Sequence, residues 1–206
     1  MKIAFALVVL MVTPTMAFAQ GTIGWANNSL EMQWTSVTDH TLIPVPVGGG
    51  QFELFVAPNG TPFTPLGTYV VQNMVLYFIP DYSSLSGFLG ANPGWSAIAT
   101  TGIGPLPGRF NGGNVALPGI AGGATAECVI IGWTGSAPSL DMALLTAGLM
   151  GSSPMLTTAT GNPTTTPPGT PVLLSATITL APIPEPPTFA LTGLGIVTLM
   201  IYRRRR

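Results

Sequence analysis

Positive charge is scarce in this chain of 206 residues, and its few cations lie mostly at the two ends. They are Lys2, Arg109 and a terminal run of Arg203, Arg204, Arg205 and Arg206, so residues 3–202 hold a single cation. Nucleic-acid binding depends on clustered Lys and Arg side chains that neutralise phosphates. No such cluster exists in the long middle segment, and we expect no nucleic-acid partner.

Cysteine and histidine each occur once, as Cys128 and His40. One cysteine excludes an internal disulfide and a thiolate metal cluster. Cys128 lies in an apolar run, which favours a small buried side chain over a nucleophile. Any catalytic triad would need His40, yet the chain has no Gly-x-Ser-x-Gly motif. The sequence therefore predicts no cofactor and no metal site of Cys and His ligands, leaving calcium held by loop oxygens as the open alternative.

Long helices are excluded over most of the chain, because 26 glycines and 21 prolines punctuate it. Short stretches rich in β-branched and aromatic residues remain between these breaks. They are residues 30–37, 52–56, 68–79, 114–117, 126–133 and 172–180. Strands at this spacing predict an all-β domain over residues 20–181, built as an antiparallel two-sheet β-sandwich.

Residues 172–180 give the clearest strand pattern, since apolar and polar residues alternate strictly there. That pattern predicts one half-buried antiparallel strand. One short helix is expected over 139–147, where Ser139 and Asp141 precede an apolar turn and Gly148 follows it. Residues 83–89 are a second candidate for a turn or two of helix. The polar, proline-rich residues 157–171 predict an extended loop.

The N-terminus has the order of a secretory signal peptide. Lys2 precedes an apolar run over residues 3–12, and Pro14 and the small residues Ala17 and Ala19 follow. Ten apolar residues are too few for a membrane span, which needs about 20. We therefore expect residues 1–19 to form a signal helix that is cleaved after Ala19, so that the mature chain is exported and begins at Gln20.

The C-terminus predicts a membrane segment with a defined orientation. Residues 188–202 carry no charge, and as a helix they would span about 22 Å, somewhat short of a hydrocarbon core of about 30 Å. Arginine side chains extend such a span by reaching the headgroups. The terminal arginines belong on the cytoplasmic side by the positive-inside rule. This orientation agrees with export of the N-terminal remainder.

Three features in residues 182–206 together resemble the PEP-CTERM sorting signal of Gram-negative bacteria. They are the triplet Pro184, Glu185 and Pro186, the apolar stretch, and the terminal arginines. The resemblance implies that an exosortase-type membrane protease recognises the triplet and detaches the chain from its inner-membrane intermediate, for delivery to the envelope, outer surface or extracellular matrix. Residues 110–133 also resemble ectodomains of PEP-CTERM proteins of Verrucomicrobia-like bacteria, a likeness that carries no known activity.

These features favour a secreted or surface-displayed, non-enzymatic protein of the cell envelope or extracellular matrix. One alternative is a carbohydrate-binding module for the cell's own exopolysaccharide, with Trp95 exposed after the turn in "ANPGWS" as the glycan contact. A weaker alternative is a polysaccharide hydrolase, which needs two carboxylates about 5 to 9.5 Å apart. Glu31, Glu53 and Glu127 lie on expected strands, although surface-facing acids explain them better. The triplets beginning at Asn27 and Asn59 are interpreted as turns rather than glycosylation sites.

Overall fold

The computed structural model describes residues 20–27, 33–35, 42–164, 172–174 and 178–184, which are mostly β-strand with two short helices. The helices are α1 (Leu85–Ala91) and α2 (Leu140–Thr146). The strands are β1 (Gln20–Ala26), β2 (Gln33–Thr35), β3 (Leu42–Pro44), β4 (Gly50–Pro58), β5 (Gly67–Gln72), β6 (Val75–Pro80), β7 (Ser96–Gly102), β8 (Asn111–Ala121), β9 (Thr125–Thr134), β10 (Leu149–Ser152), β11 (Leu156–Ala159), β12 (Val172–Leu174) and β13 (Thr179–Pro182).

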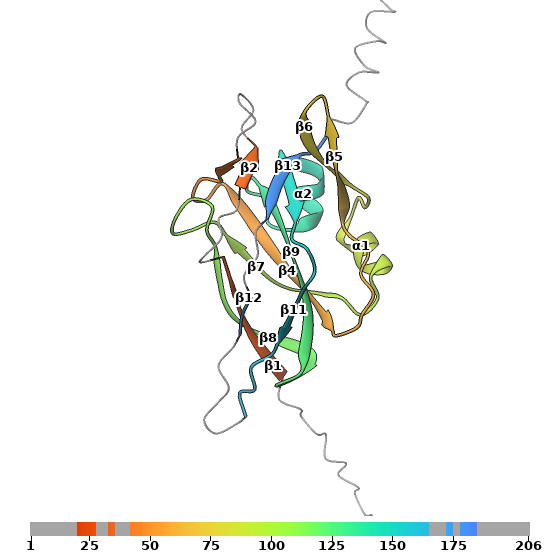
Figure 1. Cartoon of the computed structure of the whole chain (residues 1–206), viewed down its shortest axis with the longest axis vertical. Helices are drawn as coiled ribbons and strands as arrows, with labels where there is room; N and C mark the ends of the chain where they lie inside the picture. The colour runs from red at the N-terminus through yellow and green to blue at the C-terminus, as the bar shows by residue number, and fades with distance from the viewer. Residues whose placement is uncertain (1–19, 28–32, 36–41, 165–171, 175–177, 185–206) are drawn as a thin grey trace, which may run out of the picture.

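The strands form three sheets arranged in layers (Figure 1). A large sheet of eight strands runs in the order β3-β2-β13-β10-β9-β4-β7, and β11 also pairs with β9. A smaller sheet, β12-β1-β8, lies on one side of it, whereas the β5–β6 hairpin and helices α1 and α2 lie on the other. Each side holds a separate cluster of buried apolar side chains. The large sheet is therefore the middle layer of three.

The central strands β4 and β9 are buried on both faces. Phe52 and Leu54 of β4 pack toward the smaller sheet, whereas Phe55 packs into the cluster under the helices. Strands covered on both faces are continuously apolar instead of alternating, as in residues 128–131 of β9. The all-β prediction is confirmed. The prediction of a two-sheet sandwich was incomplete, because the β5–β6 hairpin and the two helices form a third layer on the far face of the large sheet.

The expected single strand over 172–180 is wrong. Its ends belong to two sheets: β12 pairs parallel to β1, and β13 lies between β2 and β10, parallel to β2 and antiparallel to β10. Ile178 and Leu180 are buried, as the alternation predicted. Ala181, which follows Leu180 directly, is buried too. A period of two indicates which side chains share a face and says nothing about the partner strand, which explains the error.

The remaining predicted elements differ mainly in length. Strands at 52–56, 114–117 and 126–133 are confirmed within β4, β8 and β9, and α2 confirms the helix at 139–147. The 83–89 candidate is α1, so there are two helices where one was expected. Residues 68–79 form a hairpin instead of one strand, and β11 overlaps the start of the expected loop. Of 30–37, only β2 is described.

Both membrane-related predictions fall outside this description. In the part of the chain that the structure describes, no helix is long and apolar enough to cross a membrane. The expected signal helix at 1–19 and membrane helix at 188–202 lie beyond the described residues. The first described strand starts at Gln20 and the last ends at Pro182.

Candidate functional site

Trp95 is buried, so the prediction of an exposed glycan platform is wrong. Its side chain is only 4% exposed, and its indole N–H donates a hydrogen bond of 2.9 Å to the Pro62 carbonyl. Its ring packs on Phe63 with centroids 4.7 Å apart. The preceding turn exists, with Gly94 at a φ of +92°, but it directs the indole inward. A turn signal does not determine the direction of the next side chain.

Asn92, a buried residue that the sequence analysis did not single out, also contacts the segment that holds Pro62 and Phe63. The Asn92 side chain accepts a bond of 2.6 Å from the Thr64 N–H and donates to the Thr64 carbonyl at 3.0 Å. It also donates to the Phe88 carbonyl at the end of α1, at 2.9 Å. Asn92 and Trp95 thus join the segment before β5 to α1. Their function is structural.

Glu53 and Glu127 lie on the same face of the large sheet, but the strand register separates them. Both are buried, with exposed fractions of 7% and 6%, so the expectation of surface-facing acids is wrong. Glu53 is opposite Ile131 and Glu127 is opposite Ala57. The two positions are four residues apart along the ladder, which corresponds to about 13 Å. That separation exceeds the range for a pair of glycosidase carboxylates.

The space between these two carboxylates is filled. Phe55 and Val129 occupy the intervening positions of the same face, and both side chains are fully buried. The Glu127 carboxylate instead accepts a hydrogen bond of 3.0 Å from the Gly60 N–H in the turn after β4. Glu31, the third acid considered, lies outside the described residues, as do Asp39 and His40.

Glu53 meets a different carboxylate at the first turn of α2. The Leu140 N–H donates a hydrogen bond to the Glu53 carboxylate. The Oε2 atom of Glu53 is buried and has no hydrogen-bond partner. The neighbouring Asp141 accepts a bond of 2.5 Å from the Leu85 N–H in the first turn of α1. Burial raises the pKa of Glu53, the Leu140 bond opposes this rise, and the Asp141 charge adds to it. Two carboxylates therefore hold the N-terminal turns of both helices.

Because folding raises the pKa of Glu53, the free energy of unfolding should fall as pH rises. The folded state binds a proton more tightly than the unfolded state does, since the pKa of Glu53 is raised by folding. The stabilisation is complete below the ordinary pKa of 4.5 and is lost as pH rises toward the raised folded value. Glu53→Gln should flatten this slope, and Asp141→Asn should reduce it less because burial is the larger cause. Urea unfolding between pH 4 and pH 8 measures all three slopes; equal slopes would contradict the assignment.

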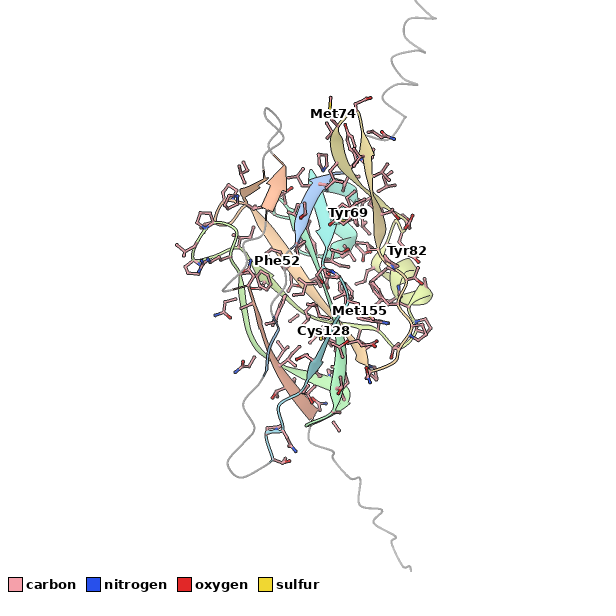
Figure 2. All side chains as sticks on the ribbon, viewed as in Figure 1. Phe52, Tyr69, Met74, Tyr82, Cys128 and Met155 are labelled. Atoms are coloured by element: carbon pink, nitrogen blue, oxygen red, sulfur yellow. The ribbon has the colours of Figure 1, made fainter. Side chains whose placement is uncertain are left out.

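Cys128 is buried in the core between the two larger sheets, as the sequence predicted (Figure 2). Burial, together with the charge of Glu127, raises the pKa of its thiol to about 12. At neutral pH it is neither a nucleophile nor a metal-binding thiolate.

The native protein should consequently resist thiol reagents. At pH 8 we expect no modification of Cys128 by a maleimide within an hour, and complete modification in 6 M guanidinium, because only the unfolded chain exposes a thiol with an ordinary pKa. Intact mass with and without denaturant measures both states. A Met74→Cys variant is the matched control, since Met74 is 88% exposed. Rapid native labelling of the parent chain would contradict burial.

Only the first residue of the expected sorting triplet, Pro184, is among the described residues. β13 ends at Pro182, and the Ile183 N–H donates to the Gly148 carbonyl at 3.4 Å. The Ile183 side chain packs against the core under the helices, and Pro184 is half-buried. Pro184 is the last described residue. Glu185, Pro186, Ala17, Ala19 and the arginines 203–206 lie outside the described part.

The two asparagines of the glycosylation triplets have different environments. Asn27 is fully buried; its side chain donates to the Gly108 carbonyl and accepts from the Phe110 N–H, both at 2.6 Å. Asn59 lies in an exposed turn before Gly60, whose φ is +82°. The turn interpretation is confirmed for Asn59, whereas Asn27 instead fastens the end of β1 to the segment before β8.

The concave regions of the described surface include one beside Tyr69 and one beside Gln20. One is a groove of about 600 Å³ whose lining includes Tyr69 and Met155, both labelled in Figure 2. The Tyr69 hydroxyl donates to the Thr179 carbonyl at 2.7 Å and accepts from the Ser152 N–H at 3.1 Å. Burial raises its pKa, while the Ser152 bond opposes that rise. These bonds tie the β5–β6 hairpin to β10 and β13, so the hydroxyl has a structural use.

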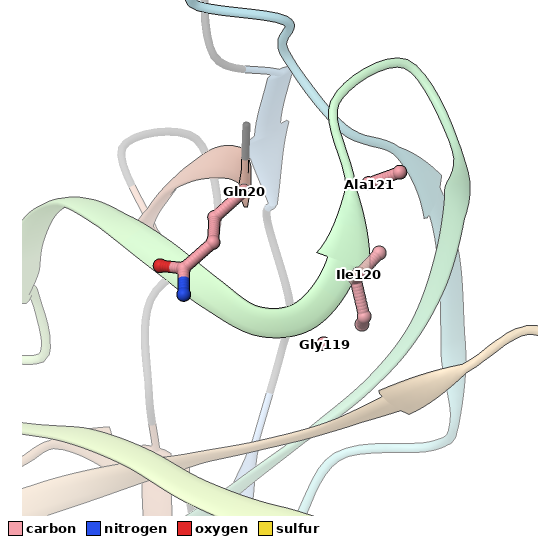
Figure 3. Close-up of a pocket in the computed structure, with 4 residues that line it drawn as sticks. All are labelled: Gln20, Gly119, Ile120 and Ala121. Carbon is pink, nitrogen blue, oxygen red and sulfur yellow. The ribbon is translucent and has the colours of Figure 1, made fainter. Parts of the chain in front are cut away.

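The other concave region lies between the start of β1 and the end of β8 (Figure 3). Its volume is about 390 Å³, and Gln20, Gly119, Ile120 and Ala121 line it. The Gln20 amide is the polar side chain among these four. Within the described ranges, no group of three or more His, Cys, Asp or Glu side chains is arranged to hold a metal ion. No protein-family model, curated protein or solved structure matches the chain.

Proposed function

We propose that this protein is exported and sorted through its C-terminal segment, and that its β domain serves as a non-enzymatic component of the envelope, outer surface or extracellular matrix. The observation that supports the proposal is the position of the outermost strands that the structure describes. β1 starts at Gln20, the expected first residue after signal cleavage, and β13 ends at Pro182, two residues before the Pro184, Glu185 and Pro186 triplet.

The fold suits removal of everything beyond Pro184. β13 lies inside the large sheet between β2 and β10, and a cut after Pro184 removes none of the described strands of that sheet. The prolines on both sides of Glu185 lack backbone donors and disfavour helix, which favours an extended substrate for a membrane protease. A domain held so close to the cut leaves few residues of spacer between itself and the membrane.

Residues named for the two alternative functions are not placed as those functions would require. The carbohydrate-binding hypothesis used Trp95, whose ring is buried. The hydrolase hypothesis used a pair of carboxylates, and Glu53 and Glu127 are separated by the register of β4 and β9.

The triplet can be tested in the native host. A Pro184→Ala, Glu185→Gln, Pro186→Ala variant should accumulate uncut in the inner membrane, because the protease would lose its recognition sequence. Fractionation with detection by an antibody against the β domain measures its distribution. Pro154→Ala is the matched control, since Pro154 is exposed and distant in sequence from the tail. Arrival of the triple variant at the surface in the parent amount and size would refute the proposed sorting role.

A further inference from the structure

The β5–β6 hairpin carries an exposed, uncharged tip with two apolar side chains among its four residues. Residues 71–74 form this hairpin tip, within which Val71 is 67% exposed and Met74 is 88% exposed. Met74 projects at one extreme of the molecule (Figure 2). No charged residue occurs anywhere in residues 54–80. The tip can therefore leave water without the desolvation of a charge.

The backbone of the turn shows that the methionine is an unexpected choice. Asn73 and Met74 both have positive φ, 51° and 63°, as in the two-residue turns that match strand twist. Asparagine adopts this left-handed conformation readily, and glycine is the usual residue at the next position. A methionine there is held in a conformation that its side chain disfavours. Such strain indicates that the side chain itself has a use.

The base of the hairpin is fixed beside the strand that leads out of the domain. Tyr69 of β5 bonds to the Thr179 carbonyl at the start of β13, at 2.7 Å. Phe78 of β6 is fully buried and packs edge-to-face against Tyr69, with ring centroids 5.1 Å apart. The base of the hairpin is therefore held to the folded body beside β13.

The hairpin tip and the end of β13 lie at the same end of the molecule, and the start of β1 lies at the opposite end (Figure 1). From the bond between Tyr69 and Thr179, the hairpin extends four residues to Asn73, or about 13 Å. The uncharged run begins at residue 188, four residues after Pro184, a distance of about 14 Å at most. The chain length that separates Pro184 from the apolar stretch is thus comparable with the length by which the hairpin projects.

We propose that the hairpin tip inserts Val71 and Met74 into the interface of the bilayer that holds the C-terminal segment, and so orients the sorting triplet beside that membrane. This inference rests on the proposed function, because it requires the anchored intermediate. Tyr77 lies on β6 three residues from Met74, and tyrosine is the residue type that favours the headgroup level. A lipid surface accepts this uncharged tip without needing a complementary shape.

An environment-sensitive fluorophore on the tip provides the test. The full chain carrying Met74→Cys is inserted into vesicles of phosphatidylethanolamine and phosphatidylglycerol and labelled; the buried Cys128 thiol does not compete. Blue-shifted emission and at least a two-fold loss of intensity with nitroxide-bearing lipids are expected. Val71→Cys should give the same changes at smaller size. Ala121→Cys, at the exposed far end beside Gln20, is the matched control and should show neither.

Three results would overturn the inference. Emission from position 74 that equals the control in carbonate-resistant, anchored chains removes membrane contact and leaves the proposed function intact. A blue shift without nitroxide quenching that grows with the protein-to-lipid ratio identifies a second copy as the occupant. Complete release of the chain by alkaline carbonate removes the anchored intermediate, and with it both the proposed function and this inference.

Discussion

Replacement of Arg203, Arg204, Arg205 and Arg206 by alanine should prevent the chain from stopping in the membrane. Each charge at the bilayer centre costs about 2.5 to 3.5 kcal/mol on insertion scales, so four together oppose translocation by roughly 10 kcal/mol. The apolar run of residues 188–202 would be about 22 Å long as a helix and is a marginal span without them. We expect the alanine variant to be released uncut, with loss of most of the surface-located form.

A quadruple Arg→Lys variant is the matched control, since it keeps the four charges and changes the geometry of the donors. It should be sorted almost like the parent if charge is what stops the tail. Fractionation and immunoblotting of parent, alanine and lysine variants in the native host measure the difference. An alanine variant that is processed and displayed in the parent amount would show that the arginines do not determine sorting.

Trp95→Ala should produce the largest loss of stability among single substitutions in the segment before β7. Removal of a buried tryptophan typically costs about 3 to 5 kcal/mol, which is a large fraction of the 5 to 15 kcal/mol that holds a domain of ordinary stability. Trp95 is 4% exposed and fastens Pro62 and Phe63 to the body. Urea unfolding of the surface-purified domain should show a clearly lower midpoint.

Trp95→Phe separates the two contributions. Phenylalanine keeps an aromatic ring against Phe63 but removes the N–H that bonds to the Pro62 carbonyl. A lost hydrogen bond of this kind costs about 1 kcal/mol, and the smaller ring adds a packing loss. The phenylalanine variant should therefore lie between the parent and the alanine variant. An unchanged midpoint in Trp95→Ala would contradict the buried position.

Local sequence patterns predicted strands and helices well where an apolar run was bounded by clear capping or turn residues. Ser139 and Asp141 before an apolar turn located α2, and the run that contains Cys128 located β9 and its burial. Pairing was harder to predict, because an alternating pattern does not identify a partner. Residues 172–180 were expected to form one strand and instead supply β12 and β13 to different sheets.

The direction of single side chains was the weakest part of the sequence analysis. Trp95 after a glycine turn and Glu53 in an apolar strand both seemed exposed, yet both are buried by layers that come from distant segments. Glu53 is covered because α2, nearly ninety positions later, places the Leu140 N–H against its carboxylate. The asparagine contacts at Asn27 and Asn92 had no sequence signal, since a buried asparagine and a turn asparagine have the same local surroundings.

The central claim is that a folded β domain is released from a C-terminal sorting segment. Intact-mass measurement of the protein taken from the surface of the native host tests it most directly. We predict a chain that begins at Gln20 and ends between Pro184 and residue 188, immediately beyond β13. A surface-located chain that still extends to Arg206 would contradict the account and would show that the tail is a permanent anchor.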